Sequence, residues 1–142
     1  MKKLLIFLFA ISFFSCKKDY QDCCAMPPLG SELNGTWKFV KLTYGFSQIS
    51  VSGDKLPFQE TLNFDFSTST FQKTQNGKLI ETSKFLIEQN SANRLIIKYL
   101  ADNTYQFFSV ETKDGKTILD LYQRAEIGSQ LADGSDYFYE KQ

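Results

Sequence analysis

Residues 59–66 read QETLNFDF, and this octapeptide is the stretch that decides the fold. In an extended chain, positions 60, 62, 64 and 66 lie on one face and positions 61, 63 and 65 on the other. The first face carries Leu62, Phe64 and Phe66 beside Glu60, whereas the second face carries only polar side chains. This period of two predicts a β-strand with one face in a core and the other in water.

Similar runs, bounded by turn residues, lie on both sides of this octapeptide. The strongest turn signal is Asn76-Gly77, a pair that favours a two-residue β-hairpin between the flanking runs. The sequence predicts strands at residues 35–44, 59–66, 69–75, 78–89, 94–100, 104–112, 116–124 and 136–141. No segment predicts a long helix, and residues 125–131 are expected to form a helical turn or two.

The spacing of these strands predicts the architecture. Most of them are separated by short turns, which favours antiparallel pairing of neighbours in sequence order. Such a meander protects its edges best by closing on itself. We therefore predict an all-β fold, an eight-stranded antiparallel up-and-down β-barrel. A β-sandwich is the alternative, but its Greek-key crossings need longer connections.

Composition narrows the functional classes. The chain has 142 residues, 42% of them apolar and 15% aromatic, which fits one packed domain. Sixteen Lys and Arg balance sixteen Asp and Glu, so no positive field favours a nucleic-acid partner and we expect none. The sequence contains no histidine, no Gly-rich phosphate loop and no nucleophile motif. We therefore expect no enzyme, no cofactor and no metal site, and we expect Asp65 and Glu81 to be solvated.

The N-terminus has the pattern of a secretory signal. Two lysines precede an apolar run at residues 4–14, which is shorter than the roughly 20 residues of a bilayer span. The run ends at Phe14-Ser15-Cys16, which resembles the lipobox of bacterial lipoproteins. That resemblance implies cleavage before Cys16 and acyl chains on its thiol, which would anchor the protein to a membrane. An ordinary signal peptide with a nearby cysteine is the alternative.

The next segment has the composition of a linker. Residues 17–32 (KKDYQDCCAMPPLGSE) are polar, contain adjacent prolines and show neither strand nor helix periodicity. We therefore divide the chain into a signal peptide at 1–15, a lipidated flexible tether at 16–32 and a barrel domain at 33–142. Cys23 and Cys24 are exposed thiols, an adjacent bridge or an intermolecular bridge, and the sequence does not decide among these.

Motifs at both ends of the predicted barrel carry a family resemblance. Residues 33–38 (LNGTWK) resemble the G-x-W that opens the first strand of lipocalins and their calycin relatives. Residues 133–139 (DGSDYFY) resemble the closing strand of the small lipocalin-like lipoproteins of Bacteroidota. In those proteins a lipobox, a tether with paired cysteines and prolines, a G-T-W-K strand and this closing strand follow one another, as they do here. The resemblance covers the whole chain and implies a lipocalin-like barrel.

The resemblance also implies a plug at one end of the barrel. In lipocalins, a basic side chain from near the C-terminus packs over the tryptophan of the first strand. In an eight-strand meander the last strand ends beside the start of the first, and this topology selects Lys141 to lie over Trp37. Arg124 falls at the opposite rim and Arg94 on the far wall. We expect a structural cation–π contact of about 0.5–2 kcal/mol.

The long connections predict where a ligand would enter. Residues 45–58 and 125–135 are both expected at the rim away from the plug, where loops on a rigid scaffold commonly carry binding determinants. Phe46, Ile49 and Val51 are expected to line a lid. The predicted pocket for an apolar ligand consists of Phe46, Phe64, Phe66, Phe85, Phe108 and Phe138. The alternative is that such rings fill the interior as an ordinary core.

Together these features predict a lipid-anchored, lipocalin-like binding protein of the bacterial cell envelope, at the outer membrane, that holds a small hydrophobic molecule. One alternative is a filled barrel that acts as an envelope adaptor or protein-interaction module through exposed aromatic side chains. A weaker alternative is a carbohydrate-binding accessory, because Tyr137 and Tyr139 would lie outside if Phe138 lies inside. The sequence specifies neither the ligand nor a protein partner.

Overall fold

The described chain is a closed antiparallel β-barrel of eight strands, which confirms the predicted fold class. The structure is a computed structural model that describes residues 27–129 and 131–142, so Cys16, Cys23 and Cys24 lie outside the described residues. The strands are β1 (Gly35–Thr43), β2 (Ser50–Ser52), β3 (Glu60–Asp65), β4 (Thr70–Gln75), β5 (Lys78–Gln89), β6 (Leu95–Tyr99), β7 (Thr104–Lys113), β8 (Lys116–Tyr122), β9 (Ala125–Glu126) and β10 (Asp136–Lys141). Two short 3-10 helices are η2 (Ser31–Leu33) and η3 (Gly53–Lys55).

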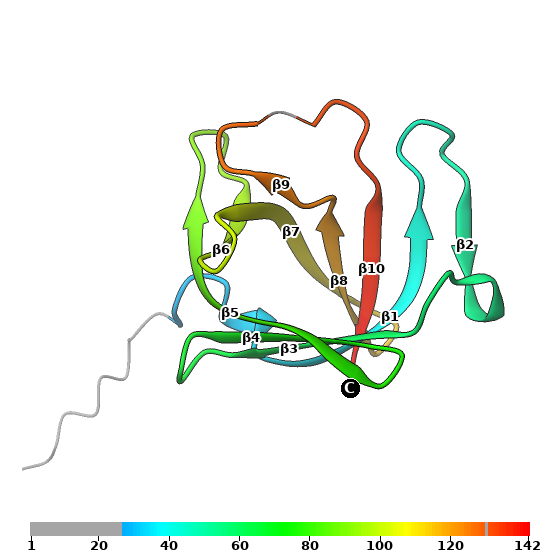
Figure 1. Cartoon of the computed structure of the whole chain (residues 1–142), viewed down its shortest axis with the longest axis horizontal. Coiled ribbons are helices and arrows are strands. Elements are labelled where there is room, and N and C mark those ends of the chain that lie inside the picture. The colour runs from blue at the N-terminus through cyan, green and yellow to red at the C-terminus, as the bar shows by residue number, and fades with distance from the viewer. Residues whose placement is uncertain (1–26, 130) are drawn as a thin grey trace, which may run out of the picture.

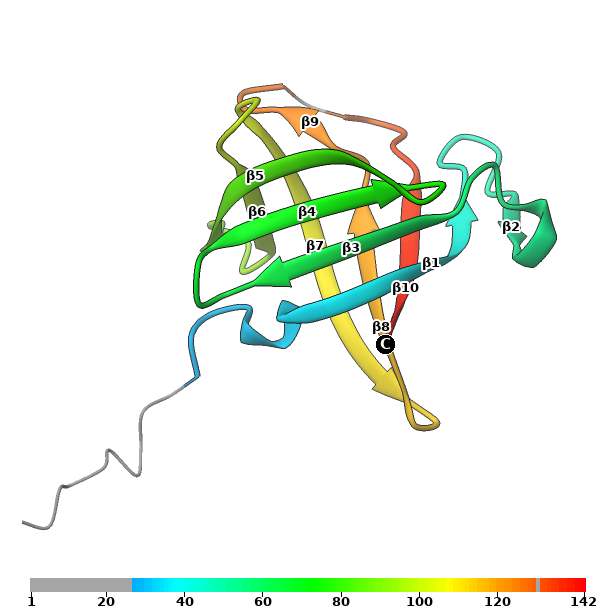
Figure 2. The same ribbon diagram turned by 60° about the horizontal axis from the view of Figure 1, so that its bottom comes forward.

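Closure depends on the pairing of the first barrel strand with the last. The order around the barrel is β1-β3-β4-β5-β6-β7-β8-β10, and β10 returns to pair antiparallel with β1 (Figure 1). Phe39 is the register partner of Tyr139, and Trp37 is the partner of Lys141. In Figure 2, β1, β3, β4 and β5 run side by side across the near face, and β7, β8 and β10 cross behind them. The edges of the sheet are therefore joined, as the meander predicts.

Each of the eight predicted strands forms. The largest difference is at β8, which ends at Tyr122, whereas the predicted strand continues to residue 124. At the predicted hairpin, Asn76 and Gly77 have φ of 48° and 79°, and Asp114 and Gly115 in the β7–β8 turn have 52° and 77°. Two consecutive residues with positive φ give the turn twist that matches paired strands, and Asn-Gly and Asp-Gly adopt it most easily.

The chain after β1 does not form the predicted lid. Its first part turns back as β2, which pairs with the second half of β1 through Thr43 and Ser50. Phe46 and Ile49 are consequently solvent-exposed at 90% and 59%, and only Val51 packs against the core. Because β1 continues into this hairpin, the predicted lid residues extend the wall of the barrel instead of covering its mouth.

Residues 125–131 also differ from the expectation of a helical turn. Ala125 and Glu126 form β9, which pairs with Tyr105 and Thr104 at the start of β7. Ala125 is buried there. Because a helix of one or two turns is marginal by itself, backbone pairing with an exposed strand edge is the more stable arrangement.

The interior is filled at the end of the barrel where β1 begins, which we call the closed end. Phe64 packs on Phe71 and Phe85, with ring centroids 5.0 and 5.4 Å apart, and Phe71 packs on Tyr99 at 4.8 Å. η2 covers this end with Leu33, whose side chain is fully buried. Gly30 precedes η2 with φ of 72°, and a Cβ there would lie 2.9 Å from the Ile87 side chain. The segment before β1 is therefore seated tightly against the closed end.

Within the described residues, no helix has the length and apolar character needed to cross a bilayer.

Candidate functional site

The closed end contains the predicted plug. The Lys141 Nζ lies 5.0 Å from the centroid of the Trp37 ring and donates a 3.0 Å hydrogen bond to the backbone oxygen of Glu32. The Trp37 indole is fully buried and donates to the backbone oxygen of Leu33 at 2.7 Å. Arg94 instead lies over the Phe107 ring. These contacts tie the first strand, the last strand and η2 together at the closed end, and we call the opposite end of the barrel the open end.

The interior members of the predicted phenylalanine pocket belong to the filled half. Phe64, Phe85 and Phe108 are buried at 1%, 3% and 7% exposure, within the hydrophobic core. Phe66 packs against Phe85 with ring centroids 5.1 Å apart. They form part of the packed core at the closed end, and none of them lines the cavity described below.

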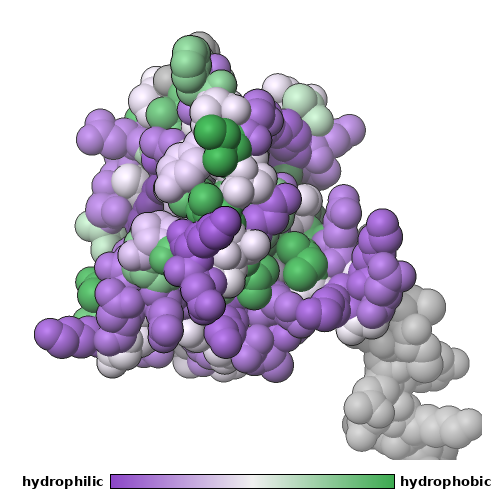
Figure 3. Space-filling model, turned by 90° about the vertical axis from the view of Figure 1, so that its right-hand side faces the viewer, coloured by the Kyte–Doolittle hydropathy of each residue, from purple (hydrophilic) through white to green (hydrophobic). Residues whose placement is uncertain are grey.

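The other two predicted pocket residues lie outside the barrel. Phe46 is at the tip of the β1–β2 hairpin. Figure 3 shows the face of the molecule that carries this hairpin: it is mostly hydrophilic, with scattered hydrophobic side chains. Phe138 has the Lys41 Nζ 4.4 Å from its ring centroid, on the outer face of β10.

The prediction that Phe138 points into the barrel is therefore wrong. Tyr139 is 3% exposed and packs on Phe39 with ring centroids 5.3 Å apart, and Tyr137 packs on the same ring at 6.1 Å. Turning this face inward buries two aromatic rings where the reverse would bury only Phe138. A register shift between Phe39 and Lys41 keeps β1 in phase with this choice and turns Leu42 inward.

A cavity of about 400 Å³ occupies the open half. Its apolar side consists of Phe58, Leu62, Phe71, Leu121, Tyr137 and Tyr139. Its polar side consists of Lys73, Gln75, Gln106, Gln123 and Arg124. The barrel interior is thus packed at one end and hollow at the other. The interior phenylalanines of the predicted pocket fill the core, as the alternative has it, and the cavity is lined by other residues.

A larger groove of about 780 Å³ opens on the side of the barrel. It forms because β1 pairs with β3 only up to Lys38 and then with β2. Its lining includes Phe39, Leu56 and Glu60. Phe58, which stacks on Phe39 at 5.2 Å between ring centroids, lines this groove and the open-end cavity alike.

Glu60 is a buried carboxylate beside the cavity. Its side chain is 1% exposed. It accepts a 2.6 Å hydrogen bond from the Tyr139 hydroxyl and forms a 3.0 Å ion pair with Lys73. Gln75 Nε2 donates a longer bond of 3.4 Å. These partners offset the loss of hydration of the carboxylate. Burial, reinforced by the Glu60 charge, raises the pKa of Tyr139 well above its usual value and keeps its hydroxyl a donor.

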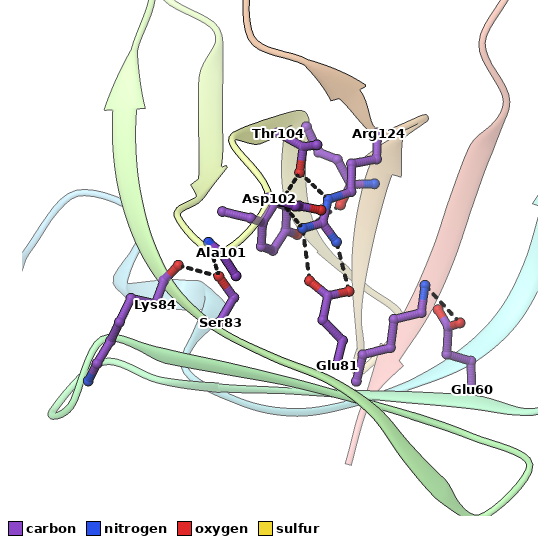
Figure 4. Close-up of polar contacts among 11 residues, drawn as sticks. Glu60, Glu81, Ser83, Lys84, Ala101, Asp102, Thr104 and Arg124 are labelled. Carbon is purple, nitrogen blue, oxygen red and sulfur yellow. Dashed lines mark hydrogen bonds and ion pairs between the residues drawn. The ribbon is translucent and has the colours of Figure 1, made fainter.

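Arg124 organises the second polar cluster (Figure 4). Its guanidinium donates a 2.8 Å hydrogen bond to Glu81 Oε2, forms a 2.8 Å ion pair with Glu81 Oε1 and contacts Asp102 at 2.9 Å, and its Nε donates to Thr104. It also stacks over the Tyr99 ring, 3.8 Å from the centroid. Burial is the largest effect on Arg124 and disfavours its charge, but the hydrogen bond to Glu81 and the surrounding negative charges together outweigh burial, and the pKa of Arg124 is raised.

The position of Glu81 differs from the expectation that its carboxylate is solvated. Along β5 the inward positions are Glu81, Ser83, Phe85 and Ile87, and Glu81 forms its ion pair with Arg124 from this face. The period of two through buried Phe85 was the available signal in the sequence. Arg124 itself lies at the open rim, where the strand order predicts it. Asp65 does fit the expectation: it accepts hydrogen bonds from Ser67 and Thr68, which lower its pKa.

Two rim loops touch at the open end. A Cβ on Gly45 would lie 2.2 Å from the backbone oxygen of Gly134 and 2.4 Å from that of Asp133. The Tyr122 hydroxyl accepts a 2.7 Å hydrogen bond from the Gly134 backbone N–H. The turn after β1 and the loop before β10 therefore hold one another in place at the mouth.

The outer wall carries a further titratable pair, Asp120 and Asp136. Burial, followed by repulsion from Asp136, raises the pKa of Asp120 to about 6, although Lys41 opposes the shift. Within the described residues, Asp120 Oδ1 is buried without a hydrogen-bond partner. No three His, Cys, Asp or Glu side chains of residues 27–129 and 131–142 are arranged to hold a metal ion.

No family model matches this chain, and comparison with curated proteins and with solved structures found no match. The resemblance to lipocalins therefore stays a prediction based on the motifs at the two ends of the barrel.

Proposed function

We propose that this protein is a non-catalytic binding protein that holds a small molecule in the open half of its barrel. The observation that carries the proposal is the cavity of about 400 Å³ above a packed closed half. Small-molecule sites are typically concave, about 300–1,000 Å³ in volume, and mainly apolar with a few placed polar groups. The aromatic and leucine side chains of the lining support a ligand with a hydrophobic body.

We further propose that the protein is anchored in the bacterial cell envelope, at the outer membrane, through acyl chains on Cys16. The support is the sequence pattern around Cys16 together with the direction of the described chain. Gly30 and η2 lie at the closed end, opposite the cavity mouth. A tether that joins the barrel at this end leaves the mouth unobstructed.

The binding proposal is tested by filling the cavity. Gln75 and Gln72 lie on the same strand, but Gln75 lines the cavity and Gln72 is exposed on the outer face. We expect native mass spectrometry of the full chain, purified from membranes, to show a co-purifying small molecule. Gln75→Trp should lose this adduct because the indole occupies the cavity, and Gln72→Trp should keep it.

Two results would contradict the proposal. One is the absence of any adduct on the wild-type protein together with no binding of added hydrophobic molecules. The other is an adduct that both tryptophan variants retain equally, since that ligand would lie elsewhere on the protein.

A further inference from the structure

The chemistry of the cavity wall identifies the class of ligand, an inference that rests on the proposed function. We infer that the bound molecule is a small amphipathic acid, with its anionic group at Lys73 and its apolar body against Phe58 and Tyr137. The argument depends on which ends of the buried ion pairs face the cavity.

The cations of the two interior ion pairs line the cavity, and their carboxylate partners do not. Lys73 and Arg124 are lining residues, whereas Glu60, Glu81 and Asp102 are not. Glu60 lies 3.0 Å from Lys73 and faces the adjoining groove, and Glu81 and Asp102 lie 2.8–2.9 Å from Arg124. A ligand in the cavity therefore meets the ammonium group of Lys73 and amide groups on its polar side.

The ammonium group of Lys73 has N–H donors available for a ligand. In the described part of the chain its ammonium group contacts Glu60 alone, and a lysine ammonium carries three N–H donors. Gln123 accepts a bond from the Ser135 N–H with its carbonyl oxygen, which leaves its side-chain N–H groups for a ligand. Hydrogen bonds between a charged donor and an anion are roughly twice as strong as neutral ones, and more so where water is excluded.

Arg124 is occupied by contacts within the protein. Its N–H groups bind Glu81, Asp102 and Thr104, and its guanidinium plane is fixed over Tyr99. A cation held this rigidly cannot turn to follow a ligand, and its charge is already compensated by two carboxylates. Lys73, with its free donors, is therefore the group that contacts the anion.

The opposite wall suits an apolar body. Phe58 is stacked on Phe39, and Tyr137 packs on the same ring, so the aromatic surface is held by the core beneath it. Leu62 and Leu121, both nearly fully buried, extend this surface. A molecule with two or three fused or linked rings and one acidic group matches both walls and the cavity volume.

The inference is tested with two fluorescent molecules that share their rings. 1-Anilinonaphthalene-8-sulfonate carries an anionic group, and N-phenyl-1-naphthylamine lacks it. Titration of the full-length protein, monitored by fluorescence, should show that both bind and that Gln75→Trp abolishes both. Binding of the sulfonate should weaken at least tenfold when Lys73→Met is combined with Glu60→Gln, and binding of the neutral amine should change less than twofold.

The paired substitution removes both members of the ion pair, so that no uncompensated charge is left in the interior. Lys113→Met is the matched control, because Lys113 is exposed at the end of β7 and lines neither the cavity nor the groove, and it should leave both affinities unchanged. A thermal unfolding midpoint of the paired variant within a few degrees of the wild-type value verifies that this variant is folded. If that variant unfolds, Lys73→Arg, which retains the charge, should keep the sulfonate affinity within about threefold.

The outcomes separate the inference from the function on which it rests. If both dyes bind and Gln75→Trp abolishes both, but the paired variant weakens both dyes equally or weakens the sulfonate no more than Lys113→Met does, the ligand class is wrong and the binding function stands. If Gln75→Trp prevents the binding of neither dye, the cavity is not a binding site. The ligand class and the proposed binding function are then both wrong.

Discussion

Two inward-facing carboxylates give the interior of this barrel its polar character. Glu60 is buried and Glu81 is partly buried, and each is paired with a base from another part of the barrel wall. A buried carboxylate without such a partner would cost several kcal/mol. Because each base also lines the cavity, the same contacts that compensate the acids hold the basic side chains in the cavity wall.

At the residue scale, Asp120 predicts an unusual pH dependence. Its pKa is raised to about 6 in the folded protein, above the unfolded value of 3.8. Between these two values the folded state holds the proton and the unfolded state does not, so stability falls as the pH rises from about 4 to 6. Asp120→Asn should reduce this slope to the part due to Asp136, whose pKa burial also raises, and should stabilise the protein at pH 7.5 by about 1 kcal/mol, after allowance for solvent screening. Urea unfolding across pH 4–8 measures both effects.

Asp65 provides the control of opposite sign. Hydrogen bonds from Ser67 and Thr68 lower its pKa in the folded protein, so its contribution to stability is present above the unfolded pKa and is lost as the pH falls through the folded one. Asp65→Asn should therefore destabilise at pH 7.5, where Asp120→Asn stabilises. The same pH slope in wild type and Asp120→Asn would exclude Asp120 as its source.

At the scale of elements, short turns set the pairing and two longer loops set the rim. The β4–β5 and β7–β8 connections are two-residue turns with positive φ at both positions. The turn after β1 and the loop before β10 instead meet across the mouth, where Gly45 lies against the backbone of Asp133 and Gly134. This contact fixes the entrance of the cavity between strands that are neighbours only through closure.

Gly45→Ala should loosen that contact. The added Cβ would lie 2.2–2.7 Å from backbone atoms of the facing loop, so the loops must separate, at a cost of about 1–3 kcal/mol. We expect a lower urea midpoint and faster amide hydrogen exchange around residues 133–135. Phe46→Ala changes the adjacent residue, whose ring is 90% exposed, and should alter neither measurement. Equal stability of Gly45→Ala and the wild-type protein would disprove the rim contact.

At the scale of the whole molecule, the barrel has two ends with different roles. The closed end is packed with aromatic rings and capped by η2, Trp37 and Lys141, and the chain enters there. The open end holds the cavity and its polar clusters. An anchor attached through the entering segment would hold the closed end near a membrane and leave the mouth accessible.

Cys16→Ser tests the anchor. In a bacterial host that processes lipoproteins, we expect the wild-type protein in the membrane fraction, because two or more acyl chains give stable anchoring. The serine variant should appear in the soluble fraction, and labelled palmitate should be incorporated into the wild-type chain alone. Cys23→Ser is the matched control and should retain both label and membrane association. Membrane association of Cys16→Ser would contradict lipidation at this cysteine.

The sequence by itself determined the strands, their turns and the closure of the barrel. These features follow from local causes: a period of two in residues 59–66, Asn76-Gly77 with its positive φ, and mostly short connections, which favour pairing with the next strand. The resemblance to lipocalins implied a basic side chain over Trp37, and strand order selected Lys141 for it, because closure brings the end of β10 to the start of β1.

Only the tertiary structure decided what the interior contains. The phase of β10 could not be read from alternating aromatic residues, since it depends on the register shift in β1 and on the buried acceptor that Glu60 offers to Tyr139. Glu60 meets Tyr139 from 79 residues away, and Glu81 meets Arg124 from 43. Periodicity acts along one strand, whereas a cavity wall is assembled from several strands whose relative register is set by packing of the whole core.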